Sequence, residues 1–335
     1  MPAPHTLNAF AALCTQSYTV RYSNPFPVCY DHLELLPQVS PDIAFVTASY
    51  NTLEWTKQLT DFFNLLEVPF SFSFTVVDNN SFDGSQDFLQ SRCNIHYIQS
   101  GQNLGYGRAI NRGVAATSGK YVCVTNSDVI LNRDALLKLW RFMEEHPEVG
   151  VCAPRVTYTD GRDQGMIFKH SLLSHYAQWF AKLVAWSSKS KIAHAAAPFR
   201  VDGVMGAFFL IRRSAIPQPA LFDEDFFFFY EDSALAHTLK NRGLPCYVVP
   251  DASIVHVGGQ SRSAAAVSFF YQGKYLYLKK FYGPFHAGAV YRVDRFRILR
   301  KYALYSLLAL LTSSKRIKSK QRGYQLAWTA PRPKL

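Results

Sequence analysis

The sequence predicts an α/β fold in which helices flank a mainly parallel central sheet, with a helical appendage at the C-terminus. From residue 42 onward, apolar runs of strand length alternate with amphipathic segments of helix length, a pattern typical of repeated βαβ units. The apolar runs end in polar turns, as strands do where a parallel sheet meets its ligands. With 26 Phe, 19 Tyr and 48% hydrophobic residues, the 335-residue chain can fill a sizeable core.

The elements of the first half follow in order. A buried strand (IAFVTAS, 43–49), a helix (52–66) and a second strand (FSFTVVD, 72–78) form the first βαβ unit. The alternation continues with a helix from about residue 84, a strand at 94–98, a helix at 106–117, a strand at 121–125 and a helix at 134–145. The carboxyl ends of parallel strands lie at one edge of a sheet, so we expect the polar residues after these strands to lie together.

The pattern loosens after residue 149. An aromatic and basic stretch at 166–200 interrupts the alternation, and a second set of elements follows, namely GVMGAFFLIRR, a helix after Glu231 and two strands, CYVVP and SIVHV. Residues 1–40 are rich in Pro, Ser and aromatic residues without a clear period, so we interpret them as an extension. The apolar run at 302–311 is shorter than the roughly 18 to 20 residues that a membrane-spanning helix needs.

Charge and cysteine usage narrow the class of partner. The chain holds 36 Lys and Arg against 24 Asp and Glu, a formal charge of +12, which favours anionic partners such as nucleotide phosphates or an acidic membrane surface. Its 6 Cys form no CxxC pair, which argues against a zinc site or a disulfide framework and fits a reducing compartment. The N-terminus lacks the basic start and apolar core of a signal peptide. We therefore expect a cytoplasmic protein.

Polar residues follow the second predicted strand. Asp78 ends this strand and can accept hydrogen bonds from a base or a ribose, whereas Asp83 can cap the next helix. A capped turn without a ligand is the alternative. A glycine-bearing segment at 103–113 then enters a helix and places Arg108 where it can meet a phosphate. This segment has neither the GxGxxG nor the Walker pattern, so dinucleotide binding and nucleotide hydrolysis lose support.

Two further positions offer metal ligands. In Asn126-Ser127-Asp128, the carboxylate that follows a buried strand can bind Mg²⁺ or Mn²⁺, which can bridge a diphosphate. His256 ends the last predicted strand and is a candidate contact for a metal or a phosphate. The alternatives are an Asp that only leads into a helix and a histidine with a structural role.

The most acidic and aromatic segment precedes a helix. It runs from Phe222 through an aromatic series to Tyr230 and ends in Glu231-Asp232. Aromatic neighbours desolvate a carboxylate and so make it a stronger base towards a substrate hydroxyl. The alternative, that Glu231 and Asp232 only complement the helix dipole, leaves the rest of the cluster unexplained.

Seven segments, taken in order, resemble family 2 of the inverting glycosyltransferases, and most closely its rhamnosyltransferase-like branch. They are VTASYN, VVDNNSFDGS, NLGYGRAINRG, TNSDVILN, GAFFLIRRSAI, LFDEDFFFFYED and VHVGG. The resemblance covers about 42–283 and implies a GT-A fold with a Rossmann-like sheet. The donor-binding residues that it implies are Thr47, Tyr50, Asn51, Asp78, Asp83, Arg108, Asn126 and Ser127.

The same resemblance implies the reacting groups. It assigns Asp232 as the base with Glu231 as its supporting acid, and it assigns Asp128 and His256 as ligands of Mg²⁺ or Mn²⁺. Many relatives have a further carboxylate two residues after the base, where this chain has Ala234. The base is therefore retained, and one group that orients the acceptor is missing.

The implied activity is the inverting transfer of a sugar from a nucleoside-diphosphate donor to a hydroxyl of a glycan or lipid-linked glycan in cell-surface polysaccharide synthesis. Our first prediction for the donor is dTDP-rhamnose, and UDP-hexoses are the alternatives. We accordingly divide the chain into an N-terminal extension (1–40), a nucleotide-sugar-binding half (41–130), an acceptor and metal half (131–262) and a C-terminal helical basic tail (263–335).

Basic residues surround the apolar run of the tail, from Arg292 to Arg322. They predict a helix at the surface of an anionic cytoplasmic membrane, within reach of lipid-linked acceptors, or else a helix packed on the core with a solvated basic end. The rival function is a non-catalytic nucleotide-sugar or polyanion-binding module. A nucleotidyltransferase would need a glycine-rich basic loop after the first strand. No nucleic acid partner is expected, because no recognised binding motif accompanies the basic tail.

Overall fold

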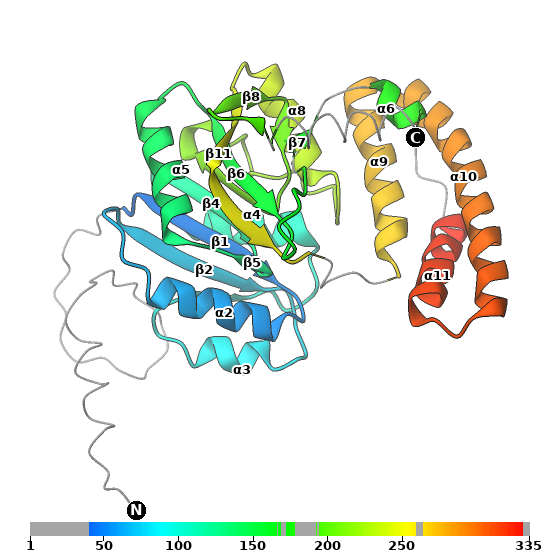
Figure 1. Cartoon of the computed structure of the whole chain (residues 1–335), viewed down its shortest axis with the longest axis horizontal. Coiled ribbons are helices and arrows are strands. Elements are labelled where there is room, and N and C mark those ends of the chain that lie inside the picture. Colours follow the sequence, from blue (N-terminus) through cyan, green and yellow to red (C-terminus); the bar gives the residue numbers. More distant parts are fainter. Residues whose placement is uncertain are drawn as a thin grey trace, which may run out of the picture. The chain divides into compact units, whose positions relative to one another are not determined.

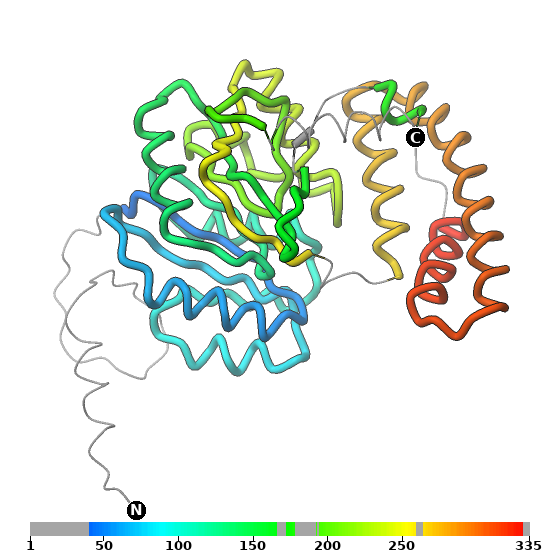
Figure 2. Tube along the Cα trace, viewed as in Figure 1, coloured from blue at the N-terminus to red at the C-terminus, as the bar shows by residue number. Residues whose placement is uncertain are grey.

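The computed structural model describes residues 40–165, 167–168, 172–177, 192, 194–258 and 264–330 (Figures 1 and 2). The predicted extension at 1–40, apart from its last residue, and most of the interrupting stretch at 166–200 lie outside these residues. Within them the predicted α/β fold is confirmed, because a central sheet lies between layers of helices and further helices follow towards the C-terminus (Figure 1).

Within the described residues, the central sheet has nine strands. They are β1 (Ile43–Ser49), β2 (Phe72–Asp78), β3 (His96–Gln99), β4 (Tyr121–Asn126), β5 (Val129–Ile130), β6 (Val151–Thr157), β8 (Phe199–Val201), β10 (Phe208–Arg212) and β11 (Cys246–His256). Their order is β3-β2-β1-β4-β10-β6-β11-β5, and β8 pairs with β11. Strands β1 to β4 run parallel, β6 is parallel to β11, and β10 is antiparallel to both of its neighbours. A separate ladder joins β7 (Ile167–Phe168) to β9 (Gly203–Val204).

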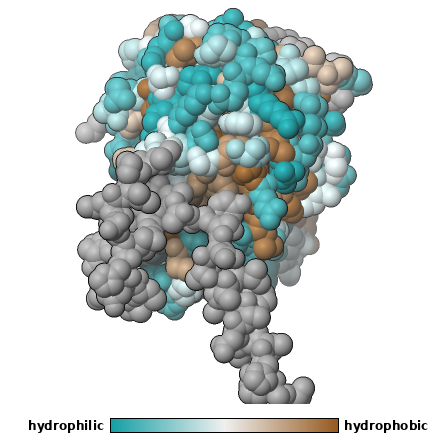
Figure 3. Space-filling model, turned by 90° about the vertical axis from the view of Figure 1, so that its left-hand side faces the viewer, coloured by the Kyte–Doolittle hydropathy of each residue, from teal (hydrophilic) through white to brown (hydrophobic). Residues whose placement is uncertain are grey.

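Helices cover both faces of the sheet. They are α2 (Leu53–Asn64), α3 (Ser85–Gln90), α4 (Tyr106–Ala115), α5 (Arg133–Glu145) and α8 (Glu231–Asn241), with a 3-10 turn at Arg213–Ala215, whereas the short helix α6 (Leu172–Tyr176) packs on the C-terminal helices. Successive strand residues point to opposite faces, so Phe45 of β1 shares a core with α2 and α5 whereas Val46 shares another with α4 and α8. The side of the domain drawn in Figure 3 is mostly hydrophilic, with hydrophobic residues gathered in one area.

The strand register brings the predicted site to one edge of the sheet. Asp78 at the end of β2 pairs with Ser49 at the end of β1, and β4 ends beside them at Asn126. β10 runs the other way and therefore begins at this edge. β11 reaches the same edge and ends there at His256, paired with β5. Residues that lie up to about 200 positions apart in the chain thus come together.

The strands of the second half differ from the prediction. The sequence pattern predicted no strand at β6, which contains Pro154, and a Pro inside an apolar run argues against a paired strand. The ladder between β6 and β11 tolerates this residue because its register shifts between Val249 and Ser253, directly after the pair that Pro154 forms. The same irregularity joins the two predicted strands CYVVP and SIVHV into the single strand β11.

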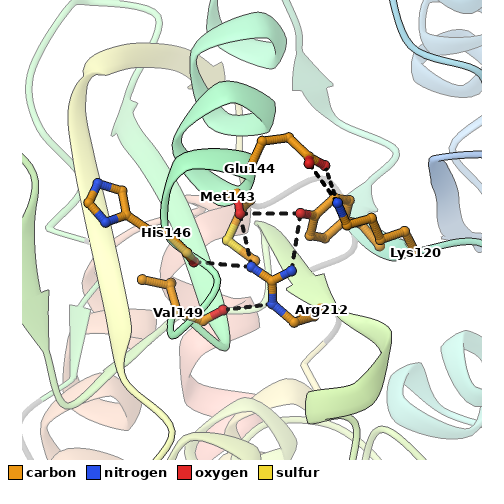
Figure 4. A network of polar contacts seen from close by, with 7 residues as sticks. Lys120, Met143, Glu144, His146, Val149 and Arg212 are labelled. Atoms are coloured by element: carbon orange, nitrogen blue, oxygen red, sulfur yellow. Dashed lines mark hydrogen bonds and ion pairs between the residues drawn. The ribbon is translucent and has the colours of Figure 1, made fainter.

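Arg212, at the end of the GAFFLIRR segment, fastens β10 to the C-terminal end of α5 (Figure 4). Its guanidinium donates hydrogen bonds to the backbone carbonyls of Met143 (2.9 Å), His146 (3.1 Å) and Val149 (3.2 Å). The last carbonyls of a helix have no partner within the helix, and a cation there also complements the helix dipole. Arg212 therefore stabilises the packing of α5 against the sheet.

The described part of the C-terminal region consists of α9 (Ala266–Tyr282), α10 (Pro284–Leu311) and α11 (Lys315–Thr329). Gly283, with a φ of 87°, separates α9 from α10, and Pro284 begins the second helix, where its missing N–H costs nothing. The three helices share a third apolar core, to which Ala234 of α8 and Phe226 of the preceding loop also belong. None of the helices in the described residues is long and apolar enough to cross a membrane.

The charged side chains inside this helical core are paired. Asp294 is buried and forms ion pairs with Lys274 (2.6 Å) and Arg297 (3.1 Å). Lys274 also donates to the carbonyl of His175, and Arg297 donates to that of Tyr176. The two cations therefore neutralise the buried carboxylate and hold the C-terminal end of α6 on the helices.

Candidate active site

The predicted metal ligands Asp128 and His256 meet at the carboxyl edge of the sheet. β5 follows Asp128 at once and pairs with the end of β11, and the N–H of Val257 donates to the Asp128 carbonyl (3.0 Å). His256 Nε2 consequently lies 3.2 Å from Asp128 Oδ1 and 3.4 Å from Asn126 Nδ2. Asp128 is 8% exposed. We name Asn126, Asp128 and His256 the metal corner.

Gln164, which the sequence did not indicate, orients the imidazole of His256. Its Nε2 donates to the backbone carbonyls of Thr157 (3.3 Å) and of His256. Its Oε1 lies 2.9 Å from His256 Nδ1 and accepts a hydrogen bond from that nitrogen. The ring proton then lies on Nδ1 and the Nε2 lone pair points towards Asp128, as an imidazole that binds a metal requires.

The side chains of the metal corner fit a divalent cation. Asn126 Oδ1 is buried and has no hydrogen-bond partner. Together with a carboxylate and a neutral imidazole, it forms a donor set that suits Mg²⁺ or Mn²⁺. In the part of the chain that the structure describes, no group of three or more His, Cys, Asp or Glu side chains could hold a metal ion. The corner is thus a partial ligand set, which a diphosphate would complete.

Asp232 lies in the first turn of α8, where two backbone N–H groups point at its carboxylate. Its carboxylate accepts hydrogen bonds from the backbone N–H groups of Gly206 (3.0 Å) and Ser233 (2.7 Å). Burial raises the pKa of this carboxyl, and both N–H groups oppose the shift. Glu231 is buried with one unpaired carboxylate oxygen, and burial, followed by the charge of Asp232, raises its pKa. Of this pair, which we name the base corner, Asp232 is the better base at neutral pH.

Tyr106 supports the base corner through Gly206. Its hydroxyl donates to the carbonyl of Gly206 (2.7 Å), whose N–H in turn holds Asp232. Burial raises the pKa of the Tyr106 phenol, and the charges of Glu231, Asp232 and Asp128 raise it further. A Cβ at Gly206 would lie 3.5 Å from that of Asp232, which is an ordinary van der Waals contact. Neither Tyr106 nor Gly206 was a predicted site residue, although both lie in motifs that carried the resemblance.

The aromatic run before α8 holds the base corner on a strained turn. Phe229 and Tyr230 have φ angles of 69° and 73°, a left-handed conformation that costs about 1 to 3 kcal/mol at a residue with a side chain. A Cβ at Gly105 would lie 2.2 Å from the Phe227 carbonyl oxygen. One at Gly273 of α9 would lie 2.5 Å from the carbonyl oxygen of Phe229. The two glycines therefore let α4 and α9 pack closely against the turn and hold it in place.

The predicted nucleoside-binding residues gather where β1 and β2 end. Thr47 and Asp78 are fully buried, and the Thr47 hydroxyl has no hydrogen-bond partner. Asn51 accepts a hydrogen bond from the N–H of Phe82 (2.9 Å), and the ring of Tyr50 stands edge-on to the Phe82 ring at 6.0 Å. Phe82 is 79% exposed. This end of the sheet thus offers an aromatic surface beside buried polar groups, as a nucleoside requires.

Asp83, Arg108 and Ser127 form hydrogen bonds within the protein. Asp83 accepts from the N–H of Leu53 (2.8 Å) in the first turn of α2. Arg108 Nε donates to the carbonyl of Glu224 (2.8 Å), and the Ser127 hydroxyl contacts a hydroxyl at the start of α2 (2.9 Å). These residues shape the loops around the site, and their contact with a donor stays a prediction.

The chain matches the model of glycosyl transferase family 2 over residues 46–218, about half of its length. It belongs to this family. The enzyme is 26% identical over 228 residues to an N-acetylglucosaminyl-diphospho-decaprenol L-rhamnosyltransferase of Mycobacterium tuberculosis, an alignment that covers 62% of this chain and 74% of that protein. It is also 25% identical over 239 residues to the low-salt glycan biosynthesis hexosyltransferase Agl10 of Haloferax volcanii, covering 67% of this chain and 71% of the relative.

Solved structures share the fold of this family 2 enzyme. The mannosyltransferase PcManGT from Pyrobaculum calidifontis, in complex with GDP-Man and Mn²⁺, has a TM-score of 0.51 at 16% identity and covers 87% of both chains. GalNAc-T7 with UDP, GalNAc and Mn²⁺ has a TM-score of 0.53 at 10% identity and covers 72% of this chain and 48% of its own. The predicted GT-A fold, the membership of glycosyltransferase family 2 and the nucleotide-sugar-dependent glycosyltransferase activity are confirmed.

Proposed function

We propose that this enzyme transfers rhamnose, with inversion, from dTDP-rhamnose to a hydroxyl of a lipid-linked glycan. The observation that carries the proposal is the pair of corners: in the base corner the Asp232 carboxylate accepts a hydrogen bond from the N–H of Gly206 (3.0 Å), and in the metal corner His256 Nε2 lies 3.2 Å from Asp128 Oδ1. A base and a divalent cation on either side of one reacting carbon are what a single displacement at that carbon needs.

The choice of donor and acceptor rests on the relatives. The name of the mycobacterial relative supports rhamnose as the sugar and a polyprenyl-diphosphate glycan as the acceptor. The hexosyltransferase of Haloferax volcanii supports a hexose as the alternative sugar. The exposed ring of Phe82 beside Tyr50 offers a surface on which either a thymine or a uracil base stacks, so these residues favour neither nucleotide. A lipid-linked acceptor would also locate the reaction at a membrane surface, on its cytoplasmic side.

Asp128, His256 and the free oxygen of Asn126 would hold the metal ion. When bound there, Mg²⁺ or Mn²⁺ supplies positive charge that stabilises the departing diphosphate. Gln164 keeps the proton of His256 on Nδ1, so that Nε2 is available as a ligand.

Asp232 accepts the proton of the acceptor hydroxyl. As that proton leaves, the acceptor oxygen forms a bond to the anomeric carbon, and the bond from this carbon to the diphosphate oxygen breaks. The new bond forms on the face opposite to the departing diphosphate, so the configuration inverts and no sugar becomes attached to the protein. Glu231, kept protonated by its burial, adds no second negative charge beside Asp232 at neutral pH.

A thermal-shift panel tests the donor-binding half of this proposal. We expect dTDP or UDP, together with Mn²⁺ or Mg²⁺, to raise the Tm more than either the nucleotide or the metal alone. Turnover of the corresponding nucleotide sugars with a polyprenyl-diphosphate acceptor then identifies the sugar. A panel in which no nucleoside diphosphate stabilises the protein would contradict the proposal.

A further inference from the structure

Helix α10 is apolar on the face that it exposes as well as on the face that it buries. Its buried side includes Ala287, Val290 and Ile298, which pack in the helical core. Of the sixteen large hydrophobic residues that are exposed in the described part of the molecule, eight lie on this helix. They are Phe285 (78% exposed), Val293 (37%), Phe296 (70%), Leu299 (42%), Leu304 (52%), Leu307 (59%), Leu310 (83%) and Leu311 (76%). Single exposed apolar residues are common, but a series on one helix calls for a partner.

These side chains form one stripe along the helix. Phe285, Phe296, Leu299, Leu307 and Leu310 recur at helical spacing on the side opposite to the buried residues. At 1.5 Å per residue, the 28-residue helix is about 42 Å long. We name this series of exposed residues from Phe285 to Leu311 the outer stripe. It is a linear surface, which suits a flat partner better than a pocket-filling ligand.

The positive charge of the protein is concentrated around the outer stripe. Residues 264–335 contain 15 Lys and Arg and one acidic residue, whereas residues 1–263 contain 21 Lys and Arg and 23 acidic residues. Lys280 is paired with Asp223 and Asp225 of the catalytic domain. The exposed basic residues of α10 and α11 are Arg292, Arg300, Lys315, Arg316, Lys318, Lys320 and Arg322. Arg292 and Arg300 lie along the stripe itself, and the first residues of α11 follow directly after its end.

We propose that α10 lies in the surface of an anionic bilayer, with the outer stripe inserted among the lipids and the basic residues of α10 and α11 on acidic headgroups. Buried apolar area and attraction to anionic lipid together bind a helix that is too polar to span. A second copy of this chain is a poorer occupant, since a symmetric pairing of two stripes would bring two strongly basic surfaces together. Membrane binding by α10 does not depend on the sugar transfer proposed above. Only the role of this binding in bringing the enzyme to a lipid-linked acceptor rests on the proposed function.

Vesicle sedimentation with the full chain tests this assignment. We expect the protein to sediment with vesicles of phosphatidylcholine and phosphatidylglycerol, and far less with phosphatidylcholine alone. The double variant Leu307→Glu, Leu310→Glu should lose roughly 100-fold in affinity, because two leucines no longer enter the lipid. Leu65→Glu is the matched control, since Leu65 is 82% exposed on the catalytic domain and should bind as the wild type does. Arg316→Gln should weaken binding about fivefold, and less at high salt.

Three results would overturn the assignment. One is equal binding by the wild-type protein to neutral and anionic vesicles, and another is unchanged binding by the double variant. The third is a wild-type dimer in light scattering that the double variant converts to a monomer without a loss of vesicle binding. The double variant should retain its activity on a short water-soluble acceptor. Measuring this activity therefore separates a failure of membrane binding from a failure of the proposed function. Loss of vesicle binding with retained soluble activity supports the membrane surface alone.

Discussion

The catalytic domain and the C-terminal helices place their polar groups differently. In the described part of the catalytic domain, six buried side-chain atoms have no hydrogen-bond partner, and three of them belong to predicted site residues, namely Thr47 Oγ1, Asn126 Oδ1 and Glu231 Oε2. In the described C-terminal helices, the Tyr275 hydroxyl is one such atom, but the buried carboxylate of Asp294 is neutralised by two cations. Buried polar groups are normally satisfied, so unsatisfied ones among predicted site residues are consistent with a ligand, whereas a neutralised carboxylate indicates structure.

The two regions also differ in what they expose. The chain up to residue 263 is nearly neutral, with 21 basic and 23 acidic residues, and the remainder has 15 basic residues and one acidic residue. The outer stripe adds exposed Phe and Leu side chains to this positive region. Our two proposals together assign the chemistry to the first region and the binding of a membrane surface to the second. Variants in each region test this assignment.

The largest expected effect comes from the base. Asp232→Asn keeps the shape of the side chain and removes the group that accepts the proton, so kcat should fall about 10²- to 10⁴-fold. Nucleotide binding should change little, because the predicted nucleoside residues lie at the ends of β1 and β2. Turnover assays and calorimetric titration with the nucleoside diphosphate measure the two quantities. Asp225→Asn, in the acidic loop nearby and 66% exposed, is the matched control. An equal loss of nucleotide affinity in Asp232→Asn would contradict this role.

The buried triad of the C-terminal helices should affect stability and not chemistry. Asp294→Asn leaves Lys274 and Arg297 without their carboxylate inside the helical core, which should cost about 3 to 5 kcal/mol in the free energy of unfolding. Urea denaturation followed by circular dichroism measures this loss. Under native conditions the folded fraction should retain its nucleotide affinity. A variant as stable as the wild type would show that the triad is not a structural element.

Gln164 should affect metal affinity. Gln164→Leu removes the acceptor that keeps the His256 proton on Nδ1, so Mn²⁺ affinity should fall about 10- to 100-fold. Electron paramagnetic resonance of Mn²⁺ in the presence of the nucleoside diphosphate measures this affinity without relying on turnover. Gln164→Glu keeps an acceptor oxygen at the same place and should lose much less. If the Leu variant bound Mn²⁺ as the wild type does, Gln164 would have no part in positioning the ligand.

The smallest effect concerns the pH dependence of stability. Burial raises the pKa of Glu231 above its usual 4.5 in the native state. Between the pKa of the unfolded chain and the raised pKa of the native state, the native protein therefore keeps a proton that the unfolded chain has released. The free energy of unfolding should therefore decrease as the pH rises through this window. Glu231→Gln removes the titration, and its stability should decrease less between pH 5 and pH 8 in urea denaturation. Parallel curves for the two proteins would exclude a raised pKa at this position.

The sequence was sufficient for the catalytic domain because its signals are local. The alternation of apolar runs and amphipathic segments predicted the strands and helices from β1 to α5, except the two-residue strand β5, since periodicity depends on near neighbours. The motifs at strand ends indicated Asp128 and His256 as metal ligands, and the acidic segment before a helix, together with the family resemblance, indicated Asp232 as the base. β6 was missed because Pro154 interrupts its pattern, and its tolerance depends on a distant irregularity in β11.

Only the tertiary structure showed the contacts between segments that lie far apart in the sequence. Gln164, Tyr106 and Gly206 have no periodic signal, and their roles follow from hydrogen bonds to His256 and Asp232 across the fold. The outer stripe was equally undetermined, because a sequence shows that a helix is apolar but not which face its neighbours cover. Composition and spacing thus determined the fold class of this glycosyltransferase, and the order of its motifs predicted the reacting groups. Packing decided which polar groups stay free for ligands and which apolar face stays open, since both depend on what lies next to a residue in space.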